Sequence, residues 1–278
     1  MRCVRWSPVR VAWGLLLLAG ASTEAAAYTI GGPGAAISTA STQWSWDGGV
    51  NTAPFRAALE NPVYFGPAGV VPETIQTVDL ATVDATSLAG VDGFISTWWR
   101  TDQSAPYDQA AVDFFLGGGD LWLLQDSVNR DGIGELLGIP TVGQTLITPV
   151  SGTAPLFDGP FGTASNITQG GGEEGYVSEA DVLAQGGTIV GRNTENLVIA
   201  AVWNPGQYAP GAGTLIVVAD IDMFTTQATF SPLDQNGIFA LNAFSFLATS
   251  VPEPSRAVLL FAVAGGAAGA VRRRRQRA

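Results

Sequence analysis

The sequence of 278 residues contains no histidine, no lysine and a single cysteine, Cys3. Without imidazoles, and without a thiol after Cys3, the chain has no zinc site of the Cys or His type and no Ser-His-Asp triad. Disulfide bonds and cysteine nucleophiles in the body of the chain are excluded for the same reason. Charged residues make up only 13% of the chain and hydrophobic residues 46%, which is the composition of a folded protein.

Basic residues are also scarce over most of the length. All 13 are arginines, and only four of them, facing 22 acidic residues, lie between Tyr28 and Pro252, so this central part has a net charge of −18. A nucleic-acid partner is excluded, because phosphate binding needs clustered Arg or Lys. The acidic surplus indicates either a well-solvated surface or binding of divalent cations outside the cell.

The first 27 residues have the pattern of a secretory signal peptide. Three arginines in the first ten residues precede an apolar core at Val11–Leu18, and Ala25-Ala26-Ala27 forms a small-residue cleavage site. We expect cleavage near Tyr28. An uncleaved anchor is the alternative, but the apolar core is short for spanning a bilayer.

The last 28 residues contain three different elements in order. The motif Pro252-Glu253-Pro254 comes first, an apolar stretch of 15 residues follows at Ala257–Val271, and four arginines come next: Arg272, Arg273, Arg274 and Arg275. The prolines favour an extended peptide. As a helix the apolar stretch covers roughly 22 Å, so it predicts a short, marginal transmembrane helix. The arginines are expected on the cytoplasmic side, with the acidic domain across the membrane.

This tail closely resembles the PEP-CTERM sorting signal of Gram-negative bacteria that make exopolysaccharide. The resemblance implies that a membrane-embedded exosortase recognises the Pro-Glu-Pro motif and removes the tail. It further implies export through the inner membrane, transient anchoring in that membrane, and release to the outer surface or the extracellular matrix of a biofilm. An ordinary tail anchor with a chance Pro-Glu-Pro is the alternative.

Residues 28–250 are expected to form one exported domain in which strands alternate with helices. This alternation predicts an α/β fold with a mostly parallel sheet flanked by helices. Residues Gly31–Thr42 are expected to be a flexible or strand-edge entry, and Pro140–Gln185 to be loops with a few short strands. The predicted strands are 75–80, 91–97, 120–124, 188–190, 197–203 and 214–219, and the predicted helices are 52–60, 107–116, 133–137 and 237–247.

Part of this domain resembles the class I glutamine amidotransferase-like fold, particularly its ThuA-like branch. The resemblance is carried by Val91–Ile95, the glycines Gly117–Gly119, the apolar run Leu121–Leu124 and the segment Gly211–Asp222. It implies a flavodoxin-like topology. Catalytic relatives have a nucleophilic Cys after the strand that follows the glycines, and a later His. Here Gln125 or Asp126 stands at the first place and the second falls near Asp220, which implies that amidotransferase activity is absent.

Ligands of an open α/β sheet meet the carboxyl ends of its strands, which selects a small set of candidate ligand-facing residues. These are Trp98, Trp99, Gln125, Asp126, Asp220 and Asp222. Carboxylates beside tryptophan faces suit sugars. Paired acids also suit glycoside hydrolysis, and acids that cap helices or bind backbone amides are the structural alternative.

The sequence therefore predicts a non-catalytic binding or structural module associated with exopolysaccharide. The alternative is a carboxylate-dependent enzyme that acts on extracellular polysaccharide. No cofactor is expected, except calcium as an alternative at the loop Asp126–Gly132, whose oxygen-bearing side chains precede a glycine.

Overall fold

The computed structural model describes residues 27–34, 36, 37, 46, 52–96, 105–128, 131–167, 172–220, 231, 232 and 234–250. Of the predicted signal peptide only Ala27 is included, and the predicted sorting tail lies outside the described residues. Within the described residues no helix combines the length and the apolar character needed to cross a membrane.

Half of the main sheet is parallel. Its strand order is β2-β1-β3-β4-β12-β11-β10-β6, and β9 and β5 extend it by a branch from β11. The neighbours from β2 to β12 pair in parallel, and the strands beyond β12 pair antiparallel. The parallel strands are β1 Tyr28–Pro33, β2 Ile75–Leu80, β3 Gly93–Ser96, β4 Asp120–Leu124 and β12 Leu215–Val218. The antiparallel strands are β5 Thr141–Leu146, β6 Val150–Gly152, β9 Glu173–Val177, β10 Thr188–Asn193 and β11 Val198–Trp203.

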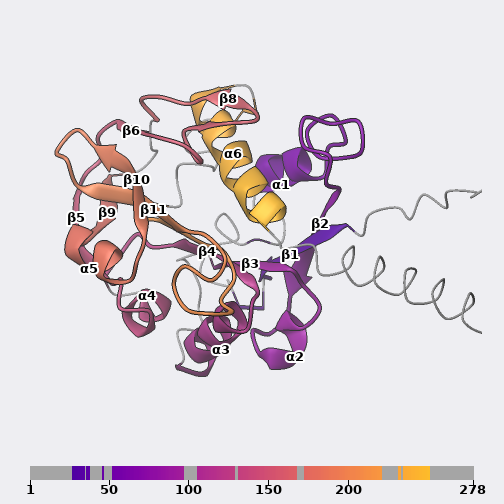
Figure 1. Ribbon diagram of the computed structural model, residues 1–278, viewed down its shortest axis with the longest axis horizontal. Helices are drawn as coiled ribbons and strands as arrows, with labels where there is room; N and C mark the ends of the chain where they lie inside the picture. Colours follow the sequence, from indigo (N-terminus) through magenta and orange to yellow (C-terminus); the bar gives the residue numbers. More distant parts are fainter. Residues whose placement is uncertain are drawn as a thin grey trace, which may run out of the picture.

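Helices cover both faces of this sheet (Figure 1). One face carries α1 and α6, and the other carries α2, α3 and α4, with α5 beside β10. A small hairpin, β7 Asp158–Gly159 and β8 Gly162–Thr163, contacts α6. The helices are α1 Ala53–Leu59, α2 Ala85–Leu88, α3 Ala105–Leu116, α4 Gly132–Leu136, α5 Glu179–Ala184 and α6 Gln235–Ser250.

The two faces of the central strands build two hydrophobic cores. In β4, Trp122 and Leu124 pack into the core under α1 and α6, whereas Leu121 and Leu123 pack into the core under α2 to α5. This division follows from the strand repeat, which turns successive side chains to opposite faces. Because both faces are buried, Leu121–Leu124 of β4 and Leu215–Val218 of β12 are continuous apolar runs.

Helix α6 contributes much of the first core through aromatic contacts. The ring of Phe244 contacts Tyr28, Phe55, Phe65 and Trp122 with centroid separations of 5.8–6.4 Å, mostly edge to face. These rings come from β1, α1, the loop after α1 and β4. The last helix therefore joins segments that lie far apart in the sequence.

The structure corrects two expectations. The sheet is mixed rather than mostly parallel, because the strands beyond β12 in the sheet order pair antiparallel. Three of them, β5, β6 and β9, lie in the region where loops and a few short strands were expected. Residues Gly31–Pro33 are not a flexible or edge entry: they belong to β1, which is paired on both sides by β2 and β3. Gly32 is needed there because a Cβ atom would overlap the Trp46 ring, which is 1% exposed.

Candidate functional site

The predicted site lies at the carboxyl ends of β4 and β12. These strands pair in parallel with Leu124 opposite Val218, so Asp126 and Asp220 each stand two residues past the paired ends. The register therefore places both carboxyl groups at the same edge of the sheet. Asp220 is fully buried and Asp126 is 9% exposed, so neither lies on the open surface.

Gln125, the first residue after β4, does not present its side chain at this edge. Its amide still belongs to the sheet, donating to the Val218 carbonyl at 2.9 Å. The buried side chain extends to the α4 side, where Nε2 donates to the Ile139 carbonyl at 3.3 Å and leaves no room for a Cβ on Gly134. The Oε1 atom has no hydrogen-bond partner among the described residues.

Strands β5 and β9 cover the same edge. The Gly175 amide in β9 donates to the Ala219 carbonyl at 3.0 Å, and Gln144 Nε2 in β5 donates to the Asp126 carbonyl at 3.0 Å. A Cβ atom on Gly175 would lie 2.9 Å from the backbone carbonyl oxygen of Gln125 and 3.1 Å from that of Ala219. Strand β9 therefore covers the backbone at the carboxyl ends of β4 and β12.

Strand β9 also places a buried carboxyl group, not predicted from the sequence, near this edge. Glu174, the neighbour of Gly175 in β9, is fully buried and accepts a 2.7 Å hydrogen bond from Asn193 Nδ2. The pair Glu173-Glu174 stands in a segment of weak periodicity, so nothing in the sequence marked one of the two as buried. Among the described residues no three acidic side chains come close enough to hold a metal ion.

The predicted calcium loop is only partly described, and its last acid has a structural role. Asp131 is 4% exposed and its carboxylate accepts a 2.6 Å hydrogen bond from the Thr141 amide, which fixes the start of β5 next to α4. Burial raises the pKa of Asp131 despite this bond. Trp98, Trp99 and Asp222 lie outside the described residues, as do the sorting motif Pro252–Pro254 and the arginines 272–275.

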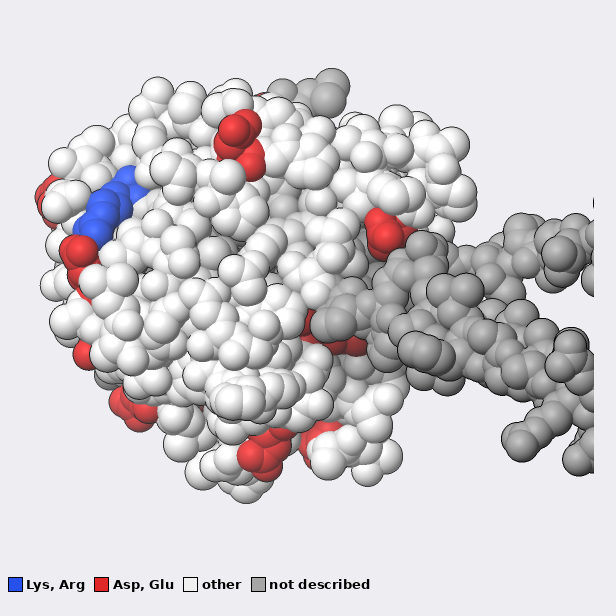
Figure 2. Space-filling view, in the orientation of Figure 1, with Lys and Arg blue, Asp and Glu red and all other residues white. Residues whose placement is uncertain are grey.

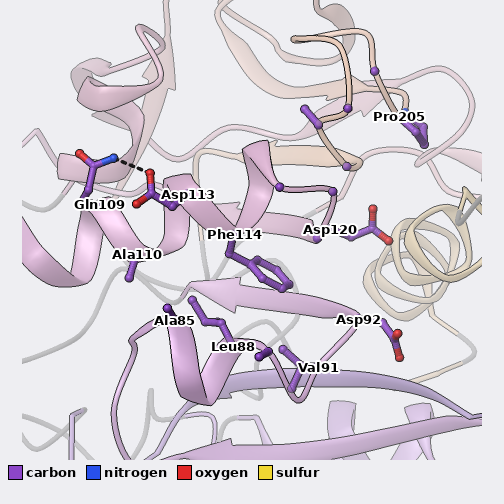
Figure 3. Close-up of a pocket in the computed structure, with 18 of the residues that line it drawn as sticks. Ala85, Leu88, Val91, Asp92, Gln109, Ala110, Asp113, Phe114, Asp120 and Pro205 are labelled. Atoms are coloured by element: carbon purple, nitrogen blue, oxygen red, sulfur yellow. Dashed lines mark hydrogen bonds between the residues drawn. The ribbon is translucent and has the colours of Figure 1, made fainter.

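A second concave region lies at the opposite, amino-terminal edge of the parallel strands (Figure 3). This amino-edge groove has a volume of about 930 Å³ and is formed by α2, α3 and the segments that precede β3, β4 and β12. Its polar side chains are Asp92, Gln109, Asp113 and Asp120, and its apolar side chains include Leu88, Val91 and Phe114. None of the predicted ligand-facing residues that the structure describes lies at this edge.

Asp120 is the buried polar centre of the amino edge. One carboxylate oxygen accepts from the Tyr28 hydroxyl at 3.0 Å and the other from the Thr214 amide at 2.7 Å, so the side chain connects β1, β4 and β12. Burial raises the pKa of Asp120, and the nearby charge of Asp92 adds to that rise. Burial raises the pKa of Tyr28 well above its usual range, and Asp120 adds to it.

Two glycine segments form the backbone wall of the groove. Gly118 and Gly211 have φ angles of +105° and +88°, which L side chains rarely adopt. The Gly213 amide donates to the Phe115 carbonyl at 3.0 Å, and a Cβ on Gly213 would overlap the Gly119 carbonyl. Glycine is therefore required where the turn before β4 passes the turn before β12.

The surface around these features is sparsely charged. Figure 2 shows scattered acidic side chains on one face, with a basic side chain beside an acidic one and no basic patch. In the described part of the chain the cations are Arg56 and Arg192, which pair with Asp79 and Glu179 at 2.8 Å. Neither arginine lines the amino-edge groove.

Comparisons with known proteins identify the fold. No protein-family model matches the chain, and no curated protein matches it. Solved structures that resemble it include the N-terminal domain of mmIFT52, with 14% identity over 79% of this chain and 96% of that chain, at a TM-score of 0.52. A thua-like protein from Bacteroides uniformis has 11% identity over 84% of this chain and 97% of that chain, at a TM-score of 0.51. The α/β architecture is thus shared with a ThuA-like protein.

Proposed function

We propose that the domain is a non-catalytic binding module of an exported protein and that it associates with exopolysaccharide. The observation that carries the proposal is that β9 covers the backbone at the carboxyl ends of β4 and β12. Where an open α/β sheet ordinarily receives its ligand, β9 lies against the backbone of Gln125 and Ala219, and the Gln125 side chain is packed inside the protein.

The two terminal segments support the export and processing steps of the proposal. Residues 1–27 have the pattern of a signal peptide, and the Pro-Glu-Pro motif, apolar stretch and arginine cluster of residues 251–278 resemble the sorting tail of an exosortase substrate. In this proposal the chain is anchored in the inner membrane until an exosortase-type enzyme cleaves it, and then reaches the outer surface or the extracellular matrix.

Intact-mass measurement of the surface-associated protein from its native host tests the processing step. We expect a chain that begins near Tyr28 and lacks the residues from about Pro254 onward. A surface-associated form that retains Arg272–Arg277 would overturn exosortase processing, and it would leave the binding module itself unaffected.

A carboxylate-dependent enzyme remains the second candidate, and one observation favours it. Asp126 and Asp220 each follow the paired ends of β4 and β12 by two residues, and Glu174 is buried in β9, the strand that covers those ends. Two acids near one another are what glycoside hydrolysis needs.

A hydrolysis and binding screen on the host's own exopolysaccharide separates the two candidates. The wild type, Asp220→Asn and the exposed control Asp158→Asn would be compared for turnover, bound polysaccharide and melting temperature. We expect all three to bind polysaccharide and none to cleave it. Wild-type turnover that falls by about 10²- to 10⁴-fold in a stably folded Asp220→Asn variant would establish the enzyme instead.

A further inference from the structure

The amino-edge groove carries acidic groups that no described cation neutralises. Asp92 is exposed and its carboxylate accepts a 2.7 Å hydrogen bond from the Thr29 amide. It lies at the same end of the groove as Asp120, close enough for its charge to act on that carboxyl group (Figure 3). Asp113 lies toward the other end, where it accepts from Gln109 Nε2 at 2.8 Å. Bound anions would be repelled along the whole groove.

The remaining lining offers apolar contact and glycine backbone, in which the amides of Gly117–Gly119 and Gly213 already donate to carbonyls of the protein. Phe114 extends from α3 toward the space between Asp120 and the side chains of Leu88 and Val91 (Figure 3). Backbone of the glycine segments Gly117–Gly119 and Gly211–Gly213 forms part of the wall. The volume of about 930 Å³ is at the upper end of the range of ordinary ligand pockets, which is about 300–1,000 Å³.

We propose that the amino-edge groove binds a sugar chain that carries free amino groups. Ammonium groups pair with Asp92 and Asp113, sugar hydroxyls donate to carbonyl oxygens of the glycine segments, and an apolar sugar face packs on Phe114. Charge complementarity selects this ligand over an acidic polysaccharide, and the described residues include no three-acid cluster suited to a metal ion. The inference rests on the proposed binding function and names the site and the class of sugar.

Calorimetric titration of the full chain in detergent tests the proposal. The probes are a glucosamine hexamer, an N-acetylglucosamine hexamer and a galacturonic acid hexamer, which differ in charge. We expect the glucosamine hexamer to bind most tightly, with an affinity that falls as salt is added, and the galacturonic acid hexamer not to bind.

Two groove variants and a matched control locate the binding. Asp92→Asn keeps an acceptor for the Thr29 amide and removes one exposed charge, so the dissociation constant for the glucosamine hexamer should rise about two- to fivefold. Ala89→Arg, at an exposed position of the lining, adds a cation and bulk and should cause a larger loss. Asp158→Asn removes an exposed carboxylate outside the groove, keeps an acceptor for Thr163 Oγ1, and should leave binding unchanged.

The outcomes separate this inference from the proposed function. Binding of the host exopolysaccharide that persists without any effect of Asp92→Asn or Ala89→Arg would overturn the groove as the site and keep the binding module. Equal affinity for the glucosamine and N-acetylglucosamine hexamers would overturn the requirement for free amines. A chain that binds neither these hexamers nor the host polysaccharide would refute the proposed function as well. Melting temperatures of all variants show whether each one is folded.

Discussion

Gly175→Ala tests directly whether β9 closes the carboxyl edge. The new Cβ atom would lie 2.9 Å from the Gln125 oxygen, 3.1 Å from the Ala219 oxygen and 3.2 Å from the Asp126 carbonyl carbon. All three are backbone atoms of strand ends, so they cannot move aside as a flexible side chain does. Either β9 shifts away from β4 and β12, or the strand ends distort.

The expected cost is that of overpacking, about 1–3 kcal/mol of unfolding free energy. Gly175 does not have a positive φ angle, so alanine can adopt its backbone conformation and the crowding is the main cost. For a domain of this size the melting temperature should fall by about 2–4 °C per kcal/mol. Urea denaturation followed by tryptophan fluorescence measures the change.

Gly172→Ala is the matched control. A Cβ atom on Gly172 would meet no described atom within 4 Å, and its φ angle is also not positive. Its stability should be unchanged or slightly increased, because alanine reduces the entropy of the unfolded chain. If Gly175→Ala were as stable as Gly172→Ala, β9 would not be closely packed on the ends of β4 and β12, and these ends would not be covered.

Two further predictions concern the cores and the amino edge. Phe244→Ala removes a fully buried ring that contacts four aromatic side chains, so it should lower the unfolding free energy by about 3–5 kcal/mol in chemical denaturation. Val63→Ala, at an exposed position, should lower it by no more than about 0.5 kcal/mol. A loss below about 1 kcal/mol for Phe244→Ala would contradict the packing of α6. The raised pKa of Asp120 means that its protonated form favours the folded state, so this contribution is fully present below the unfolded-state pKa and is lost as pH rises through the folded-state pKa. Asp120→Asn should therefore lack that loss, and its stability relative to the wild type should improve from acidic toward neutral pH. A stability difference between Asp120→Asn and the wild type that stays constant with pH would refute the raised pKa of Asp120.

The sequence predicted best those elements whose structure depends on residues adjacent in the chain. The predicted strand at 75–80 has the bounds of β2, and the continuous apolar run at 120–124 is β4. The predicted helix 107–116 ends where α3 ends, just before the glycines at 117–119, whereas the close contact of these glycines with Gly213 depends on the fold. These features can be recognised locally, because burial on both faces demands apolar residues and helix ends demand particular caps.

Only the tertiary structure showed that β9 covers the ends of β4 and β12 and that a groove lies at the amino edge. Tyr28–Pro33 lacks strong apolar alternation, and its place as an inner strand depends on pairing with β2 and β3 from much later in the chain. Likewise, β5 and β9 form in a segment of weak periodicity, and β9 reaches the strand ends through one hydrogen bond to Ala219 and a glycine that tolerates the contact. Residue types alone placed Asp126 and Asp220 at the carboxyl ends of strands. That those ends are covered, and that the groove lies at the amino ends, follows from non-local pairing and shape, which a linear pattern does not encode.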